Sequence, residues 1–193
     1  LGLALGLYHR LQVREEEGQG LELRVVGEGA AVLARDETNL ICQAMASAFT
    51  ACGYRPGRLL LESSSQIPLA CGLGSSAAAC LAGLAAGMWL SRQELDPPRL
   101  IELALAVEGH ADNIVPSLLG GFTVVAGTHG QVRYLRLEPP DELEAAAVVP
   151  DFTLLTRKSR AVLPEQIPFA DAVANQGRVA LLTAALALGR LEL

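Results

Sequence analysis

The chain has 193 residues, of which 51% are hydrophobic and 19% are charged, and its net charge is −6. This composition is typical of a chain that buries a core, and it argues against long disordered segments. The length allows one domain, or one domain and part of a second. The acidic balance and the scattered basic residues argue against nucleic acid and membrane surfaces as partners, because both attract clustered Lys and Arg.

The four cysteines, Cys42, Cys52, Cys71 and Cys80, have no metal-ligand spacing, and no signal peptide precedes them. We therefore expect reduced thiols and a cytoplasmic protein. The chain opens at Leu1 inside an apolar run and stops directly after a helical pattern. From this we expect that both ends are cut.

The first predicted elements are a strand and a helix. Residues Leu21–Val26 alternate apolar with polar side chains, which is typical of a half-buried strand in a β-rich opening. Apolar residues then recur at helical spacing from Thr38 to Ala51, with Asp36 or Thr38 as candidate N-caps and Gly53 as the stop.

The middle of the chain is predicted to be mainly helical. A short strand at Leu59–Ser63 leads through a glycine-rich segment into a helix over Ser76–Leu90. A second helix starts at Asp96-Pro97-Pro98 and ends near Glu108-Gly109, because proline suits the first turn and glycine favours termination. The next residues, His110-Ala111-Asp112-Asn113, are predicted to form a polar loop.

The last third returns to sheet. Phe122–Ala126 and Val132–Leu137 are predicted to pair as a hairpin, and Pro139-Pro140-Asp141 is the predicted domain boundary. Beyond that boundary, the pattern indicates strands at Ala146–Val149 and Phe152–Leu155 and a helix over Phe169–Leu188.

The glycine-rich segment is the strongest local signal for chemistry. Glycines let backbone N–H groups converge, and the following helix adds unpaired N–H donors and the positive end of its dipole. Such a loop binds anions, most often phosphate. The hydroxyls of Ser75 and Ser76 could cap the helix, contact a phosphate oxygen or ligate Mg²⁺. The candidate nucleotide-binding residues are Pro68, Leu69, Ala70, Cys71, Gly72, Leu73, Gly74, Ser75, Ser76, Ala77 and Ala78.

Two plainer interpretations of this segment exist. The loop could serve only as a helix cap. Alternatively, Leu69–Leu90 contains no charged residue and includes the small-residue pair Gly83 and Gly87, as a membrane helix would. Length argues against the membrane, because the helix from Ser76 to Leu90 reaches only ~22 Å at about 1.5 Å per residue, against a hydrocarbon core of ~30 Å.

The loop lacks the Gly-Lys-Ser/Thr of the Walker motif and the spacing of the dinucleotide fingerprint. Residues 68–78 resemble instead the second motif of the small-molecule kinases grouped as galactokinase, homoserine kinase, mevalonate kinase and phosphomevalonate kinase. The segments Glu108–Asn113 and Leu118–Phe122 resemble the homoserine kinase form of the next block, except that Ala111 replaces the usual proline. Thr156–Pro164 is similar to a further homoserine kinase segment.

The resemblance implies a fold of the α/β class with a two-layer α+β architecture. Residues 1–140 would form a nucleotide-binding N-terminal domain, like the second domain of ribosomal protein S5, without its first strand. Residues 141–193 would begin a ferredoxin-like C-terminal domain. The implied activity is ATP-dependent phosphorylation of the L-homoserine side-chain hydroxyl to O-phospho-L-homoserine, a step of threonine biosynthesis.

The resemblance also implies a role for each candidate residue. Ser76 and Glu108 would hold Mg²⁺, although a solvated helix-end glutamate is the plainer interpretation. Asn113 would orient the homoserine hydroxyl without removing its proton, beside Asp112 as a second substrate residue. Arg160 suits the α-carboxylate of the substrate, because a guanidinium forms a bidentate fork.

A further asparagine, Asn39, matches a family residue near the adenine, and it could equally be a helix cap. The other expected partners are the substrate L-homoserine and a second copy in a homodimer. Since relatives carry further segments at both ends, we expect this chain to be weakly active or inactive. The alternatives are a mevalonate-type or shikimate-type kinase, and a nucleotide-binding module without turnover.

Overall fold

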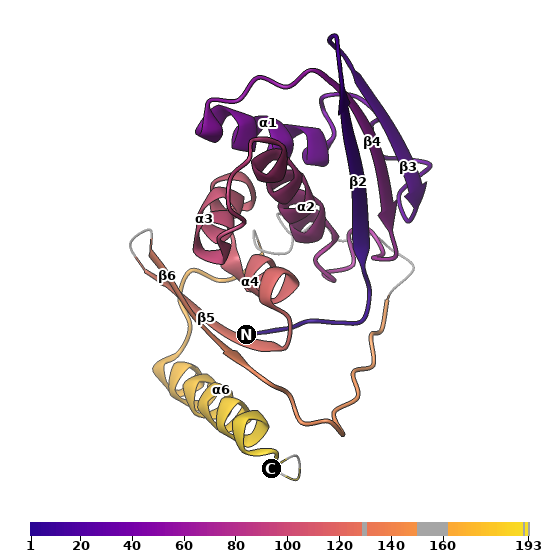
Figure 1. The fold of residues 1–193 in the computed structure, drawn as a ribbon. Coiled ribbons are helices and arrows are strands. Elements are labelled where there is room, and N and C mark those ends of the chain that lie inside the picture. Colours follow the sequence, from indigo (N-terminus) through magenta and orange to yellow (C-terminus); the bar gives the residue numbers. More distant parts are fainter. Residues whose placement is uncertain (129–130, 150–161, 191, 193) are drawn as a thin grey trace.

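The computed structural model describes residues 1–128, 131–149, 162–190 and 192. Its first sheet has the strand order β2-β4-β3, with β2 at His9–Glu16, β4 at Arg58–Ser65 and β3 at Leu21–Gly27. The central strand β4 pairs antiparallel with β2 and parallel with β3, so that β4 separates two strands that follow each other in sequence (Figure 1). Strands were expected at β3 and β4, whereas β2 was not singled out.

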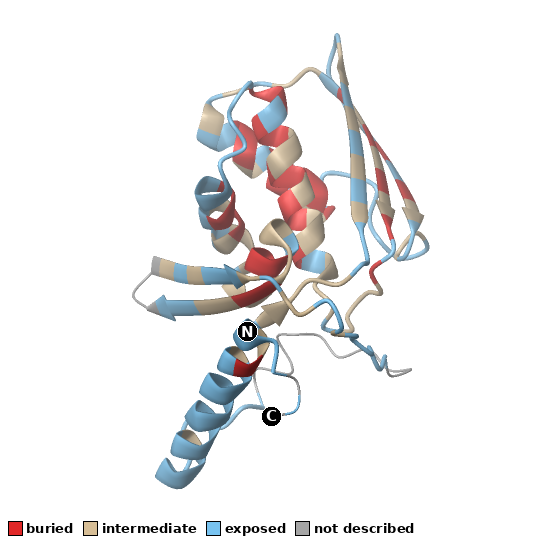
Figure 2. Ribbon diagram, turned by 60° about the horizontal axis from the view of Figure 1, so that its bottom comes forward, coloured by how far each residue is buried: buried red, intermediate tan, exposed pale blue. Residues whose placement is uncertain are grey.

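Helices α1 (Leu40–Cys52) and α2 (Ser75–Leu90) pack on the inner face of this sheet. Helices α3 (Pro97–Glu108) and α4 (Ala111–Leu119) pack against α2, and α4 also contacts the strands of the second sheet. In Figure 2 the residues coloured as buried are concentrated along the helices beside the sheet, chiefly α2, and recur along the neighbouring strands. Burial of this apolar surface is the main stabilising contribution to the fold.

Close contact between α1 and α2 explains the paired glycines of the charge-free segment. A Cβ built on Gly83 would lie 2.5 Å from the Ile41 carbonyl oxygen, and one on Gly87 would lie 2.7 Å from the Ala48 Cβ. The small residues therefore let two helices approach inside a core. Within the described part of the chain, no helix is long and apolar enough to cross a membrane.

Helix ends follow local capping chemistry. The α1 N-cap is Asn39, whose side chain accepts a hydrogen bond from the Ile41 N–H at 3.0 Å. The cap role considered for Asn39 is therefore confirmed, whereas Asp36 and Thr38 are not the N-cap, since the Asp36 carboxylate accepts hydrogen bonds from the Thr38 N–H and hydroxyl. Helix α3 starts where it was expected, and Asp96 caps it by accepting from the Arg99 N–H at 3.0 Å.

The predicted polar loop at residues 110–113 is wrong, because these residues start helix α4 with His110 as the N-cap. The helix contains Pro116, a residue that normally breaks a helix. Here Pro116 packs against β1 (Gly2–Leu3), where a Cβ on Gly2 would lie 2.7 Å from the proline Cγ. Burial of Ile114 and Val115 stabilises the short helix.

The second sheet has the order β1-β5-β6, and its hairpin of β5 (Phe122–Thr128) and β6 (Gln131–Leu137) confirms the expectation. Helix α6 spans Phe169–Leu188 as expected and lies beyond the hairpin, away from α1 and α2 (Figure 1). The expected strand at 146–149 is wrong: these residues form no strand, Val148 is 93% exposed, and no other described segment pairs with them. The expected strand at 152–155 lies outside the described residues.

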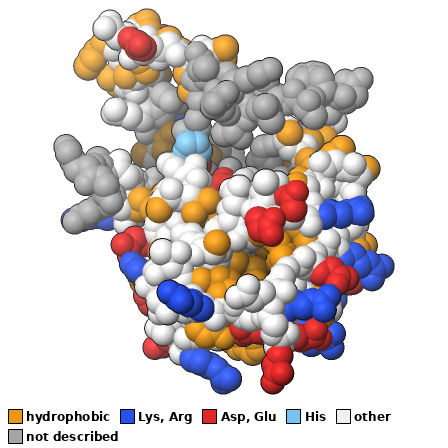
Figure 3. Space-filling view, turned by 90° about the horizontal axis from the view of Figure 1, so that it is seen from above, with side chains coloured by type: hydrophobic (Ala, Val, Ile, Leu, Met, Phe, Trp, Pro, Cys, Tyr) orange, Lys and Arg blue, Asp and Glu red, His pale blue; other side chains and the backbone are white. Residues whose placement is uncertain are grey.

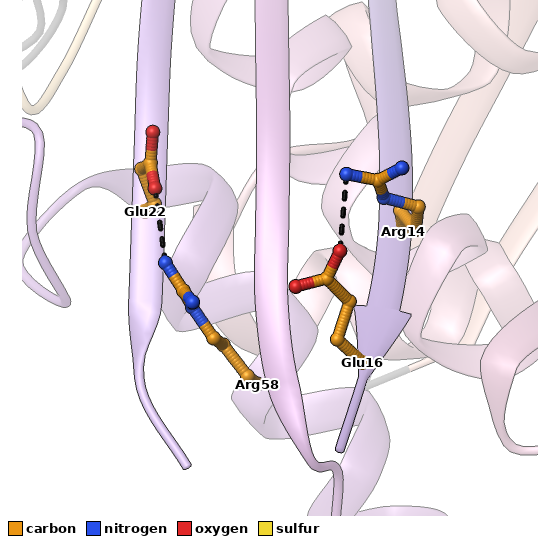
Figure 4. A network of polar contacts seen from close by, with 4 residues as sticks. All are labelled: Arg14, Glu16, Glu22 and Arg58. Atoms are coloured by element: carbon orange, nitrogen blue, oxygen red, sulfur yellow. Dashed lines mark hydrogen bonds and ion pairs between the residues drawn. The ribbon is translucent and has the colours of Figure 1, made fainter. Parts of the chain in front are cut away.

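The outer face of the first sheet is charged. Arg14 pairs with Glu16 along β2 at 3.0 Å, and Arg58 of β4 pairs with Glu22 of β3 at 3.3 Å (Figure 4). On the face of the molecule seen in Figure 3, basic side chains are interspersed with acidic ones rather than gathered in one patch. Such exposed pairs contribute little stability, about 0–1 kcal/mol each.

The four cysteines form two classes. Cys42 and Cys80 are buried, and burial raises the pKa of Cys42 to about 11 and that of Cys80 to about 12. Their reactive thiolate fraction at pH 8 is therefore roughly 10⁻³ or less.

We expect timed alkylation of the folded protein at pH 8, read by peptide mass spectrometry, to label Cys52 and Cys71 first and the buried pair only after unfolding. Equal alkylation rates at all four thiols would contradict the burial of Cys42 and Cys80 in the core.

Candidate functional site

The glycine-rich loop turns tightly between β4 and α2. Ala70, Gly72 and Gly74 have φ values of 55°, 75° and 81°, in the left-handed region that glycine adopts freely. Ala70 pays a steric cost of about 1–2 kcal/mol there. The loop ends at Gly74, the N-cap of α2, which makes no side-chain hydrogen bond to the helix start. The loop thus supplies the cap residue of α2, and the first N–H groups of the helix face the loop without a side-chain acceptor from the N-cap.

A cavity of about 650 Å³ opens on one side of this loop. One wall is the N-terminal run from Leu3 to His9, and the opposite wall is formed by Gly72, Leu73 and Gly74 with the small side chains of α2. Helix α4 contributes Asn113, Pro116 and Ser117. The cavity therefore brings the glycine-rich loop together with polar groups on α4.

Asn113 and Ser117 lie one turn apart on the α4 face that meets the loop. A Cβ built on Gly74 would lie 3.7 Å from both the Asn113 Oδ1 and the Ser117 Oγ. Asn113 was a predicted site residue, whereas Ser117 was not. Its spacing of four residues from Asn113 would have indicated it, had the segment been recognised as a helix.

A second cavity, of about 220 Å³, lies on the other side of the start of α2. Its wall combines apolar side chains such as Leu33, Leu40 and Leu69 with the polar Asn39. Asn39 is only 6% exposed, and its amide also donates to the Ala34 carbonyl at 2.7 Å. The capping role of Asn39 is thus observed, and the same side chain forms part of a cavity wall.

Ser76 and Glu108, the predicted metal ligands, are in contact. The Ser76 hydroxyl donates to the Glu108 Oε1 at 2.5 Å, joining the start of α2 to the last residue of α3. A carboxylate at a helix C-terminus is disfavoured by the dipole unless a cation is near. Oxygen donors of this kind fit Mg²⁺, which commonly uses one or two carboxylates and ligand phosphates. Among the described residues, no three His, Cys, Asp or Glu side chains form a metal-binding group.

The other predicted site residues differ in their relation to the two cavities. Asp112 lies in the first turn of α4 and is not part of either cavity wall. Arg160 lies outside the described residues. Of the candidate loop, Gly72, Leu73, Gly74 and Ala78 line the larger cavity, and Leu69, Ser75 and Ser76 line the smaller one.

Comparisons with known proteins agree with this architecture. A family model described as “GHMP kinases N terminal domain” matches residues 39–121. The chain is 40% identical over 192 residues to the homoserine kinase of Petrotoga mobilis, covering 100% of this chain and 62% of the relative. It is 41% identical over 189 residues to the homoserine kinase of Streptomyces coelicolor, covering 96% of this chain and 61% of the relative.

The fold matches a crystal structure of homoserine kinase from Cytophaga hutchinsonii with a TM-score of 0.77 and 26% identity, over 94% of this chain and 59% of that one. The chain therefore spans about 62% of the length of the curated relatives. The mixed α/β fold of its N-terminal part is the fold of these kinases.

Proposed function

Since the chain belongs to the GHMP kinase family, we propose that the protein phosphorylates the side-chain hydroxyl of L-homoserine with ATP, giving O-phospho-L-homoserine. The observation that carries the proposal is the pair of cavities that meet at the glycine-rich loop. One cavity can hold a nucleoside and the other an acceptor, with the phosphates on the loop between them. The 40% identity to a homoserine kinase supports the choice of acceptor.

The smaller cavity is the proposed nucleoside site. Its apolar wall suits a purine ring, and Asn39 supplies a polar side chain at the edge. The phosphates would then lie on Gly72–Ser76, where the first N–H groups of α2 and the helix dipole favour negative charge.

The larger cavity is the proposed acceptor site. Asn113 would orient the homoserine hydroxyl for in-line attack on the γ-phosphate, with Asp112 adjacent and Arg160 binding the α-carboxylate. An amide cannot accept the hydroxyl proton as a base. Phosphoryl transfer tolerates this, because its loose transition state depends chiefly on alignment and charge neutralisation.

Ser76 and Glu108 are the residues that would hold Mg²⁺, which supplies charge neutralisation at the phosphates. The contact between their side-chain oxygens supports this assignment. We further propose that residues 1–140 form the N-terminal kinase domain, with the topology of the second domain of ribosomal protein S5. Residues 141–193 would begin a ferredoxin-like domain of a cytoplasmic homodimer.

A substrate panel with the full-length gene product tests this function. Release of ADP in the presence of ATP and Mg²⁺ should require L-homoserine, and should not occur with mevalonate, shikimate or L-threonine. Turnover of another alcohol would overturn the substrate assignment. Nucleotide binding without turnover on any alcohol would leave only a binding module.

The variant Asn113→Ala should lower kcat for homoserine about 10²-fold, because misalignment of the reacting groups has a cost of that order. Asn175→Ala, the same change at an exposed position of α6, is the matched control and should stay within twofold. Full activity of Asn113→Ala would show that Asn113 does not orient the hydroxyl.

A further inference from the structure

His9 occupies the junction of the two cavities. It lines the larger cavity with the N-terminal run and the smaller cavity with Asn39 and Ser63. Among the described residues, no other residue belongs to both walls. His9 is the first residue of β2 and lies opposite Ser65 of β4 in the sheet register.

The buried face of β4 changes from apolar to polar side chains beside His9. Leu59 and Leu61 face the core, whereas Ser63 and Ser65 continue the same face, buried at 2% and 8% exposure. Buried hydroxyls are costly unless they are hydrogen-bonded. Ser65 accepts from the Ile67 N–H at 3.1 Å, and the Ser63 Oγ lies 3.3 Å from the His9 Nε2.

The surroundings of His9 favour the neutral form of its imidazole. Burial lowers the pKa of His9 below its usual value, so the ring carries one donor and one acceptor nitrogen. Ser63 engages Nε2. A neutral ring fixed on one side can present its other nitrogen to a ligand without introducing a charge.

We propose that His9 is a nucleotide-contacting residue, that its Nδ1 bonds the sugar–phosphate part of the nucleotide, and that Ser63 positions its ring. This rests on the proposed function. A nucleotide with its base in the smaller cavity and its transferred phosphate at the larger one must pass the junction. A ribose hydroxyl or phosphate oxygen is therefore the group that meets the imidazole there.

Titration calorimetry on the full-length protein with Mg²⁺ and a non-hydrolysable ATP analogue tests the inference. His9→Ala should weaken nucleotide binding about tenfold, and His9→Asn, which keeps a donor and an acceptor, should restore most of it. Homoserine affinity should change less than twofold. Ser63→Ala should weaken nucleotide binding less, and should add little to His9→Ala, because both act on one interaction.

Gln12→Ala, on the exposed outer face of the same strand, is the matched control and should bind nucleotide like the wild type. If His9→Ala does not fold, His9→Phe keeps a ring of similar shape without hydrogen bonds and should show the same tenfold loss. A purely structural role would lower Tm and leave the dissociation constant of the folded protein unchanged.

The outcomes separate the two proposals. If the wild type binds no nucleotide, the proposed function fails. If the wild type binds nucleotide and the His9 variants bind within twofold of it, only the inference about His9 is overturned.

Discussion

Glu108→Gln is expected to lower the rate of phosphoryl transfer to homoserine by roughly 10²–10³-fold, the cost typical of losing one electrostatic group that stabilises a transition state. The change keeps the size of the side chain and removes its charge. The Ser76 hydroxyl, 2.5 Å from the Glu108 carboxylate, would lose its charged partner. Rates should be measured over a range of Mg²⁺ concentrations, and the variant should need more Mg²⁺ for half-maximal rate.

Helix α3 offers a matched control for this change. Glu102 lies on the same helix and pairs with Arg99 on the surface, where its side chain is 70% exposed. Glu102→Gln should keep its rate within twofold, because exposed ion pairs contribute little. Retention of more than half the activity by Glu108→Gln would show that this carboxylate does not hold the metal.

Gly83→Ala is expected to destabilise the fold by about 1–3 kcal/mol, because a methyl group there overpacks a rigid core. The new Cβ would lie 2.5 Å from the Ile41 carbonyl oxygen and 2.9 Å from the Ala44 Cβ. Both neighbours belong to α1, so that relief requires α1 and α2 to separate. Urea denaturation followed by circular dichroism should show the loss as a lower midpoint.

Gly177→Ala is the same substitution where space is open. Gly177 lies inside α6 with nothing within 4 Å of a built Cβ. Replacing this helical glycine by alanine should stabilise the folded protein by about 0.5–1 kcal/mol. If both variants shifted the midpoint in the same direction, close contact of α1 with α2 would not be the reason for the glycine at position 83.

Both cavities are formed by segments that are distant in the sequence and meet only in the fold. Strand β4 carries leucines where it meets α1 and α2, and serines where it leaves them. The larger cavity depends on β1 and α4, which are far apart in the sequence and pack against each other. The site therefore exists only when the N-terminal run has docked on the helices.

The sequence by itself determined the features that depend on neighbours in the chain. Helical spacing and caps such as Asp96, Gly53 and Gly109 predicted α1, α2, α3 and α6, and alternation predicted the hairpin. The Gly-rich loop and the nearby Glu108 were visible as motifs. These signals are local, because capping and periodicity act within a few residues.

Only the tertiary structure decided which distant segments meet. The insertion of β4 between β2 and β3 depends on pairing residues that are far apart in the sequence, such as His9 with Ser65 and Leu21 with Leu59, and no local pattern encodes that order. Helix α4 forms despite Pro116 because burial of Ile114 and Val115 outweighs a local breaker. For the same reason Ser117 and His9 were missed: each reaches a cavity through packing against other elements, and burial acts over the whole fold.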